Sequence, residues 1–524
     1  METAWAPLRI RVFRALWLAQ LASLVGTWMQ TVGAQWLLVD QPNAETLVAL
    51  VQTASMSPVF FLALPAGVFA DVFDRRRLLI GVQTAAMLAA GVLAVLTAAG
   101  QVRPALLLTF TFLLGCAQTL TVPAWQALIP ELVPRDQLPA ASALGGISMN
   151  LARAVGPALA GLLIARVHVA AVFAVNALSF GLLVLALIAW RRRLVEADDR
   201  PERFGAALVA GGRYIRHSRV VRRILLRSLL FVVPGTVVWA LLALVANRRL
   251  GLGPGGYGLL LAALGAGAVA GAFALPRLRR QTSTNGIILL ASLVYAAALV
   301  VVALVPSPAA VTVALFAAGA AWLAVLANLN ATMQLFLPGW VRARGLSTYQ
   351  IVFIGGQAVA AVVWGVLAEQ FGLVAVFLAA AGLMVAGAAS LRRWPLRDIE
   401  GMDRGRAMYW PEPHLDFEPE PDDGPVLVTV TYRVAEDRQA QFLEAMEAVR
   451  RSRQRTGASR WDLYRDGADR HHFVETFVVP SWAEHLRQHG ERLTVTDQAL
   501  EERAYALADG TPEVQHLFSV QRRF

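Results

Sequence analysis

Lysine is absent from this 524-residue sequence, and cysteine occurs only once. All 47 basic residues are therefore arginine, a bias that we attribute to genome composition rather than to mechanism. The single cysteine, Cys116, excludes an internal disulfide, and as a small apolar side chain in an apolar segment it requires no functional role. Only 16% of the residues are charged while 57% are hydrophobic, which excludes an ordinary soluble globular protein.

Long apolar segments fill the chain from Leu16 to about Leu391. A hydrocarbon core of about 30 Å needs about 20 apolar residues per helix. Only helices and closed barrels satisfy all backbone polar groups in lipid, and these segments are too long and too uniformly apolar for barrel strands. The sequence therefore predicts an all-α polytopic membrane protein with twelve spans. They are expected at 14–39, 46–70, 78–99, 104–128, 139–165, 169–190, 224–246, 256–276, 286–305, 309–335, 344–368 and 372–391.

The arginines gather in the loops on one side of these spans, as in the clusters Arg75–Arg77 and Arg277–Arg280. The opposite loops hold few, such as Arg103 and Arg166. The positive-inside rule then places both termini in the cytoplasm, as an even number of spans also requires. No segment resembles a cleaved signal peptide. We expect a multi-pass protein of the inner (cytoplasmic) membrane.

A charged cluster connects the second and third spans. Gly67 permits close helix approach, and Asp71 is a carboxylate at a helix end that can pair with Arg75 or Arg76. Such a cluster can hold the protein in one conformation, so we interpret it as a gating latch and not as a substrate site. A weaker repeat at Gly271–Arg280 lacks the aspartate.

The fifth span combines a helix-bending motif with a charge. Pro157 removes a backbone hydrogen bond, while Gly156 and Gly161 allow tight packing, so the helix can bend at a moving interface. Arg153 lies in the same span, where an isolated guanidinium is unfavourable by at least about 2.5 kcal/mol. It either faces a partner or water inside the protein, or reaches the cytoplasmic end of its helix; both readings are open.

Several of these patterns resemble the major facilitator superfamily. Two sets of six spans with a basic central loop have its arrangement. Gly67–Arg77 resembles its loop signature, and Asn150–Gly161 its antiporter signature. With Val122–Arg135 and Leu250–Leu252, the chain from about 10 to 395 resembles the transmembrane secretion effector branch, which is similar to the enterobactin exporter group. The resemblance implies export of a small molecule, a siderophore or a drug-like amphipath, by alternating access with proton antiport.

Polar residues within spans are the candidates for a substrate pathway, although they also hydrogen-bond between helices. No carboxylate lies deep in a span; Asp40, at a non-cytoplasmic end, is the candidate proton site, and sodium coupling or facilitated diffusion stays open. The candidate pathway residues are Gln30, Gln35, Asn176, Asn328, Asn330 and Gln357.

The composition changes after Arg393. We divide the chain into a six-helix half (1–190), a cytoplasmic central loop (191–223), a second half (224–393), an acidic proline-rich linker (394–424) and a soluble domain (425–524). Strand and helix patterns in the soluble domain follow a β-α-β-β-α-β order, which is ferredoxin-like. This domain resembles dimeric αβ-barrel domains of the antibiotic-biosynthesis monooxygenase type, a resemblance that implies a homodimer paired through the sheets.

His485 and His489 lie four residues apart on one predicted helix of this domain, without the glutamate of a zinc-protease motif. Two such histidines are more often solvated than metal or haem ligands. We expect no metal, no cofactor, no nucleic-acid partner and no enzymatic activity, and favour a dimerisation or ligand-sensing role. The alternatives are a bifunctional transporter and enzyme that modifies its substrate, and a receptor that uses the transporter fold without transport.

Overall fold

The computed structural model describes residues 5–190, 212–396, 415 and 417–520. Two compact units divide the chain. The membrane unit comprises Met1–Glu196, Leu226–Leu329 and Tyr349–Pro395. The tail unit comprises Ala197–Leu225, Asn330–Thr348 and Leu396–Phe524. Most of the predicted central loop and of the predicted linker lies outside the described residues.

Eleven helices in the described part of the chain are long and apolar enough to cross a bilayer. The second of these spans runs from α2 into the first turns of α3. It is divided between two helices because Pro58 starts a new helix there. The eleventh contains two predicted spans that meet at Gly372, whose φ of 81° breaks the helix. The first half contains α1 (Arg11–Leu37), α2 (Ala44–Met56), α3 (Pro58–Val72), α4 (Arg75–Ala98), α5 (Pro104–Leu132), α6 (Leu138–Arg166) and α7 (Val169–Ala189). The second half contains α9 (Arg219–Leu244), α10 (Pro254–Gln281), α11 (Thr284–Leu304), α12 (Pro308–Phe336) and α13 (Gly339–Ala389).

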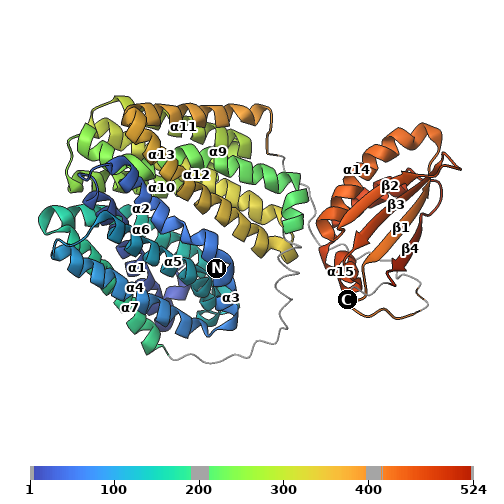
Figure 1. Cartoon of the computed structure of the whole chain (residues 1–524), viewed down its shortest axis with the longest axis horizontal. Coiled ribbons are helices and arrows are strands. Elements are labelled where there is room, and N and C mark those ends of the chain that lie inside the picture. Colours follow the sequence, from blue (N-terminus) through green and yellow to red (C-terminus); the bar gives the residue numbers. More distant parts are fainter. Residues whose placement is uncertain (1–4, 191–211, 397–414, 416, 521–524) are drawn as a thin grey trace. The chain divides into compact units, whose positions relative to one another are not determined.

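Short polar signals set the ends of these helices. Asp74 precedes α4 and accepts a hydrogen bond from the Arg77 backbone N–H at 2.8 Å, which satisfies one of the unpaired donors of the first turn. Ser283 caps α11 in the same way through Gly286 N. Within the unit, α1 packs on α6 and α7, α4 packs on α7, and α6 packs on α10 of the second half (Figure 1).

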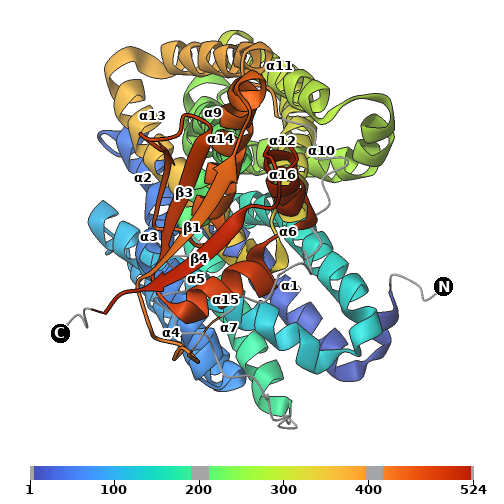
Figure 2. The same ribbon diagram turned by 90° about the vertical axis from the view of Figure 1, so that its right-hand side faces the viewer.

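The tail unit has the predicted β-α-β-β-α-β order. Its strands are β1 (Val426–Arg433), β2 (Arg460–Arg465), β3 (His472–Val479) and β4 (Glu513–Phe518), in the antiparallel order β2-β3-β1-β4. Helix α14 (Gln439–Thr456) joins β1 to β2, and its Phe442 and Met446 pack on the alternate residues of β1 that point inward. Figure 2 shows β3, β1 and β4 side by side in this sheet.

The sequence predicts one helix over 481–507, but the structure divides this segment. It consists of α15 (Trp482–Arg487), a π-helical turn over Gln488–Arg492, and α16 (Val495–Tyr505). The division arises because Thr494 and Asp497 form a capping box that starts a new helix.

The segment that leads into α9 with the first turns of this helix, the end of α12 and the start of α13 belong to the tail unit. Arg213 donates to the Gly457 carbonyl at 3.0 Å, and the Tyr214 ring meets the Trp340 ring edge-on at 5.6 Å. The guanidinium of Arg492 lies 5.0 Å from the centre of the same Trp340 ring. These contacts lie within the tail unit and include the first turn of α13.

Candidate substrate cavity and gates

A cavity of about 370 Å³ lies inside the membrane unit, between its two halves. This volume is in the range of small-molecule sites. Helices α1–α7 line it from the first half, and α9, α12 and α13 line it from the second. Amides and hydroxyls form most of its polar lining: Thr27, Gln30, Thr31, Gln52, Gln83, Thr111, Gln118, Thr121, Asn176 and Gln357 are among them.

Aromatic rings connect the two halves beside the cavity. The ring centres of Trp28 on α1 and Trp239 on α9 are 5.7 Å apart, and those of Trp239 and Trp322 on α12 are 5.8 Å apart. Phe353 on α13 continues the series at 6.3 Å from Trp322. Such tilted and edge-on arrangements are favourable for aromatic pairs, so the cavity has a continuous aromatic wall.

Arg153 is the charged residue among those that line the cavity. Its guanidinium carbon lies 5.5 Å from the Trp28 ring centre and 5.9 Å from that of Trp239, within the range of cation–π attraction. Its Nε is shielded from solvent and has no hydrogen-bond partner in the described residues. The structure therefore favours the reading in which this arginine faces the protein interior.

The amides of the cavity are only partly paired with one another. Asn176 donates to Gln30 Oε1 at 3.2 Å, and Gln83 donates to Thr121 Oγ1 at 3.0 Å. Gln30 Nε2, Gln83 Oε1 and Trp239 Nε1 are buried without a partner in the described part of the chain. Polar groups left in this state are available to a ligand or to water.

The structure places the predicted pathway residues in different environments. Gln30, Asn176 and Gln357 line the cavity, as does Arg153. Gln35 instead donates to the Trp239 carbonyl at 2.9 Å and accepts from the Tyr257 hydroxyl.

Neither of the two predicted asparagines of α12 is among the residues lining the cavity. Asn328 accepts a hydrogen bond from Arg279 Nε at 2.9 Å, and Asn330 belongs to the tail unit.

Sequence reasoning missed three cavity residues: Gln52, Gln83 and Gln118. All three are amides inside predicted spans, which is the same signal that identified Gln30. Applying that rule to every span would have found them.

Charged and polar contacts join the two halves at the end of the bundle where α1 ends and α2 begins, here called the α1–α2 end. Asn247 donates to Asp40 Oδ1 at 3.0 Å. Arg248 pairs with Glu45, and Thr46 hydrogen-bonds to Glu369. Asp40, the candidate proton site, is thus an exposed member of this cluster and does not line the cavity.

Helix α6 lies unusually close to its neighbours at its glycines. A Cβ added at Gly156 would lie 2.7 Å from Trp28 Cβ, and one added at Gly161 would lie 2.6 Å from the Pro254 carbonyl oxygen of α10. Pro157 lies between them, inside the helix. The predicted span-five motif therefore forms contacts both within the first half and between the halves.

The predicted latch lies at the opposite end, where α3 ends and α4 begins. Gly67 and Asp71 fall within α3, but the Asp71 side chain and the surroundings of Gly67 lie outside the described part of the structure. Arg75 donates to Glu131 Oε1 at 2.9 Å and to the Ala127 carbonyl at 3.1 Å, both on α5. Arg76 donates to the Leu187 carbonyl of α7 at 2.7 Å.

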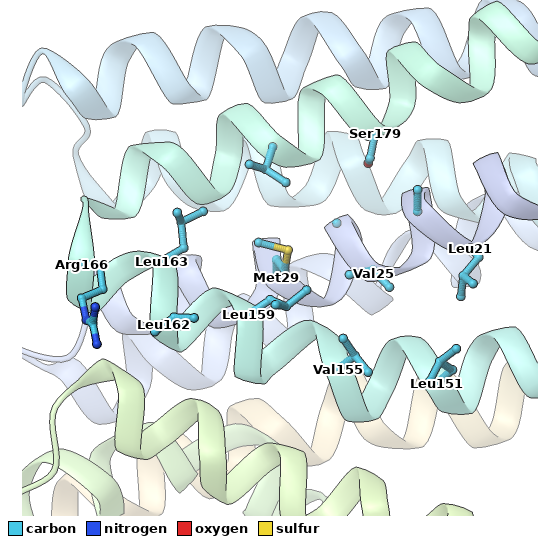
Figure 3. Close-up of a pocket in the computed structure, with 13 residues that line it drawn as sticks. Leu21, Val25, Met29, Leu151, Val155, Leu159, Leu162, Leu163, Arg166 and Ser179 are labelled. Atoms are coloured by element: carbon cyan, nitrogen blue, oxygen red, sulfur yellow. The ribbon is translucent and has the colours of Figure 1, made fainter.

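A second hollow, of about 710 Å³, lies between α1, α6 and α7 (Figure 3). Leu21, Val25, Leu159 and Leu162 line it, and Arg166 marks one end. Because Leu159 and Leu162 are exposed on the outside of the bundle, this groove is a surface suited to lipid chains rather than a polar binding site.

His485 of the tail unit is not solvated, contrary to the expectation from the sequence, whereas His489 is partly exposed. His485 is fully buried, and its Nε2 lies 2.9 Å from His516 Nε2. Burial, reinforced by the neighbouring His516, lowers the pKa of His485 to about 3. In the fold, the His485 ring packs against Trp482 and against His516 of β4. The described residues contain no group of three or more His, Cys, Asp or Glu side chains arranged to hold a metal ion.

Comparison with known proteins gives a consistent result. Residues 2–524 match the family described as transmembrane secretion effector. The staphyloferrin A transporter of Staphylococcus aureus is 23% identical over 52% of this chain and 69% of its own length. The multidrug efflux pump Tap of Mycolicibacterium fortuitum is 25% identical over 72% of this chain and 93% of its own length. The enterobactin exporter EntS of Salmonella typhi is 27% identical over 54% of this chain and 67% of its own length.

Solved structures share the fold of the helical part. A bacterial homologue of the lysosomal transporter Spinster, in an inward-facing and unoccupied conformation, superposes with a TM-score of 0.59 at 14% identity, covering 74% of this chain and 95% of that one. A point mutant of the nucleoside transporter NupG superposes with a TM-score of 0.60 at 13% identity, covering 73% of this chain and 99% of that one.

Proposed function

The chain belongs to the transmembrane secretion effector family, and from this we propose that it exports an amphipathic small molecule across the inner membrane by alternating access. The observation that carries the proposal is the cavity between the two halves, with its amides and its aromatic wall. Amides suit a polar part of a ligand and indoles suit its apolar body.

The contacts at the α1–α2 end supply one gate of this cycle. We propose that this end faces away from the cytoplasm, with both termini in the cytoplasm, so that the structure corresponds to a conformation closed to the outside. The polar pairs Asp40–Asn247 and Glu45–Arg248 and the close approach of α6 and α10 support this assignment. Opening the gate requires these pairs to separate.

We propose proton antiport as the driving reaction. The residues that line the cavity include no carboxylate, so a coupling carboxylate has to be sought at the gates. Asp40 remains the proposed proton site, because its partner across the gate is the neutral amide of Asn247. Protonation of Asp40 would remove its charge from this contact and ease separation.

The tail unit is proposed as an accessory to transport and not as an enzyme. Tyr214, which precedes α9, and Trp340, at the start of α13, pack within this unit, and this continuity of the chain supports a role in stabilising or sensing the position of the two helices. Pairing of two chains through the sheet face opposite α14 would give a homodimer. This face carries the alternate residues Leu427, Thr429 and Thr431 of β1.

Energised efflux tests the proposal directly. The full chain in everted membrane vesicles is given a panel of amphipathic dyes, drugs and siderophores and compared with a chain that ends at Arg393. Flux that collapses with a protonophore and survives truncation supports proton-driven export by the membrane unit. Binding without flux for every compound would instead indicate a receptor.

The proposed latch has its own test. Asp71→Asn removes the carboxylate expected to pair with the α4 arginines, and we expect it to reduce efflux strongly while membrane insertion stays normal. Glu131→Gln provides a comparison, because Glu131 is an observed partner of Arg75. Unchanged efflux in Asp71→Asn would exclude the latch.

A further inference from the structure

The substrate cavity contains a cation without an observed anion partner. Arg153 is the charged group among the residues that line it, and no ion pair or hydrogen bond to its guanidinium is found in the described residues. Removal of an ion from water is strongly unfavourable inside proteins. Contacts with two indole rings offset only part of that cost.

Exposure to the cavity explains how the charge is tolerated. The residue as a whole is half-buried, whereas its Nε is shielded, so the accessible part of the guanidinium faces the space between the halves. Water there can solvate it when no ligand is present. A guanidinium presents several N–H donors in a planar fork that matches a carboxylate.

The nearby unpaired groups have the same polarity as Arg153. Gln30 directs its Oε1 to Asn176, which leaves its Nε2 as a free donor, and Trp239 Nε1 is a donor without a partner among the described residues. An indole N–H and a guanidinium donate only, so neither can satisfy the other. Three unpaired donors in one cavity require acceptor atoms, and one unpaired acceptor, Gln83 Oε1, is available within the lining.

We propose that Arg153 binds a carboxylate or another anionic oxygen group of the exported molecule. Gln30 and Trp239 donate further hydrogen bonds, and the aromatic wall holds the apolar body. The site therefore selects acidic amphipaths over neutral ones of the same shape. That the ligand is an exported molecule rests on the proposed function. The anion site itself does not, because a binding experiment tests it directly.

Two pyrene compounds that differ in one group test the site. 1-Pyrenebutyrate carries a carboxylate, and 1-pyrenebutanol is neutral with the same ring and chain. Binding to the purified full chain is followed by quenching of tryptophan emission, because Trp28, Trp239 and Trp322 line the cavity and pyrene accepts their energy. We expect the wild type to bind the butyrate at least tenfold more tightly than the butanol.

Substitutions at 153 separate charge from structure. Arg153→Met keeps much of the length of the side chain and removes its charge; we expect it to lose the butyrate preference while retaining butanol binding. Arg153→Lys retains the charge and is expected to keep most of the preference. Equal affinities for both compounds in the wild type, or an unchanged preference in Arg153→Met, would overturn the proposal.

The efflux panel distinguishes the two proposals. Arg153-dependent butyrate binding without any efflux would contradict the export function and leave the anion site established. Efflux of the panel, with no carboxylate preference in binding, would contradict the anion site and leave export standing. If Arg153→Met does not fold, the single variants Arg153→Lys and Gln30→Leu are compared instead. A smaller preference for the butyrate in Gln30→Leu than in Arg153→Lys supports the proposed hydrogen-bond donors, and an unchanged preference overturns the proposal.

Discussion

The cavity of the membrane unit and the interior of the tail unit surround their buried cations in opposite ways. In the tail unit, Arg453 lies 2.8 Å from Glu501 and 3.2 Å from Glu475, and Arg492 lies 2.7 Å from Glu484. Arg455 pairs with Asp497. In the membrane unit, Arg153 faces a cavity with aromatic rings beside it in place of a carboxylate.

This difference separates polar groups that build a fold from polar groups that await a ligand. A buried ion pair with all its partners specifies one arrangement, and removing one partner leaves an uncompensated charge. A cation beside an open cavity can be neutralised by something that enters and leaves. The contrast predicts that substitutions in the tail affect stability first, whereas substitutions in the cavity affect ligand binding first.

The largest effect is expected from breaking the tail network. Arg453→Met leaves Glu475, which is fully buried, without its cation, so we expect the tail to lose about 3–5 kcal/mol of stability. Hydrogen exchange of β1 and β3 amides in the full chain measures this loss. Arg460→Met is the matched control, since Arg460 pairs with Asp462 at the surface; comparable acceleration in both variants would refute the contrast.

A glycine contact tests the interface between the halves. Gly161→Ala places a methyl group against the Pro254 carbonyl, and relieving such a clash costs about 1–3 kcal/mol. We expect efflux to fall about tenfold, because the closed α1–α2 end is disfavoured. Gly145→Ala on the same helix meets nothing within 4 Å and serves as the control. Equal efflux in both variants would exclude a role for this contact.

Acidification probes the buried histidine of the tail. The pKa of His485 is about 3 in the folded tail, so below its ordinary value of about 6.5 only the unfolded chain takes up the proton. Its contribution to stability is complete above pH 6.5 and falls by about 1.4 kcal/mol per pH unit as the pH decreases toward 3.

His485→Gln should make the exchange of tail amides less dependent on pH over that interval. Leu486→Gln, an exposed neighbour, should retain the wild-type dependence. A pH dependence shared by all three proteins would assign it to other groups.

The smallest effect is expected at the charged gate. Glu45→Gln breaks the pair with Arg248, which is partly exposed, and such pairs contribute about 0–1 kcal/mol. We expect the efflux rate to change by less than about fivefold, and the change to shrink in high salt. A loss as large as that of Gly161→Ala would show that this pair, and not helix contact, dominates closure.

Much of the architecture was accessible from the sequence because lipid permits so few backbone arrangements. The spans and the order of strands and helices in the tail follow directly from apolar length and from alternating patterns. Local devices were harder to foresee. The break at Gly372 and the new helix at Thr494 each depend on backbone geometry or capping within an otherwise helical pattern.

The site was predictable in part. Gln30, Asn176, Gln357 and Arg153 were found because polar residues in spans are rare and stand out. Asn328 is also a polar residue within a span, but it accepts a hydrogen bond from Arg279, and a single sequence does not reveal that pairing. The burial of His485 likewise depends on β4, which is distant in the sequence and supplies His516.

The close approach of α6 and α10 has a consequence for the speed of transport. Where Gly161 faces Gly255 and Gly258, the touching surfaces are main chain, with no side chains that interlock. One helix can then rotate on the other without any rotamer change, so this surface adds little friction to the motion. A side chain added at this surface, as in Gly161→Ala, should therefore slow turnover more than the loss of the partly exposed Glu45–Arg248 pair does.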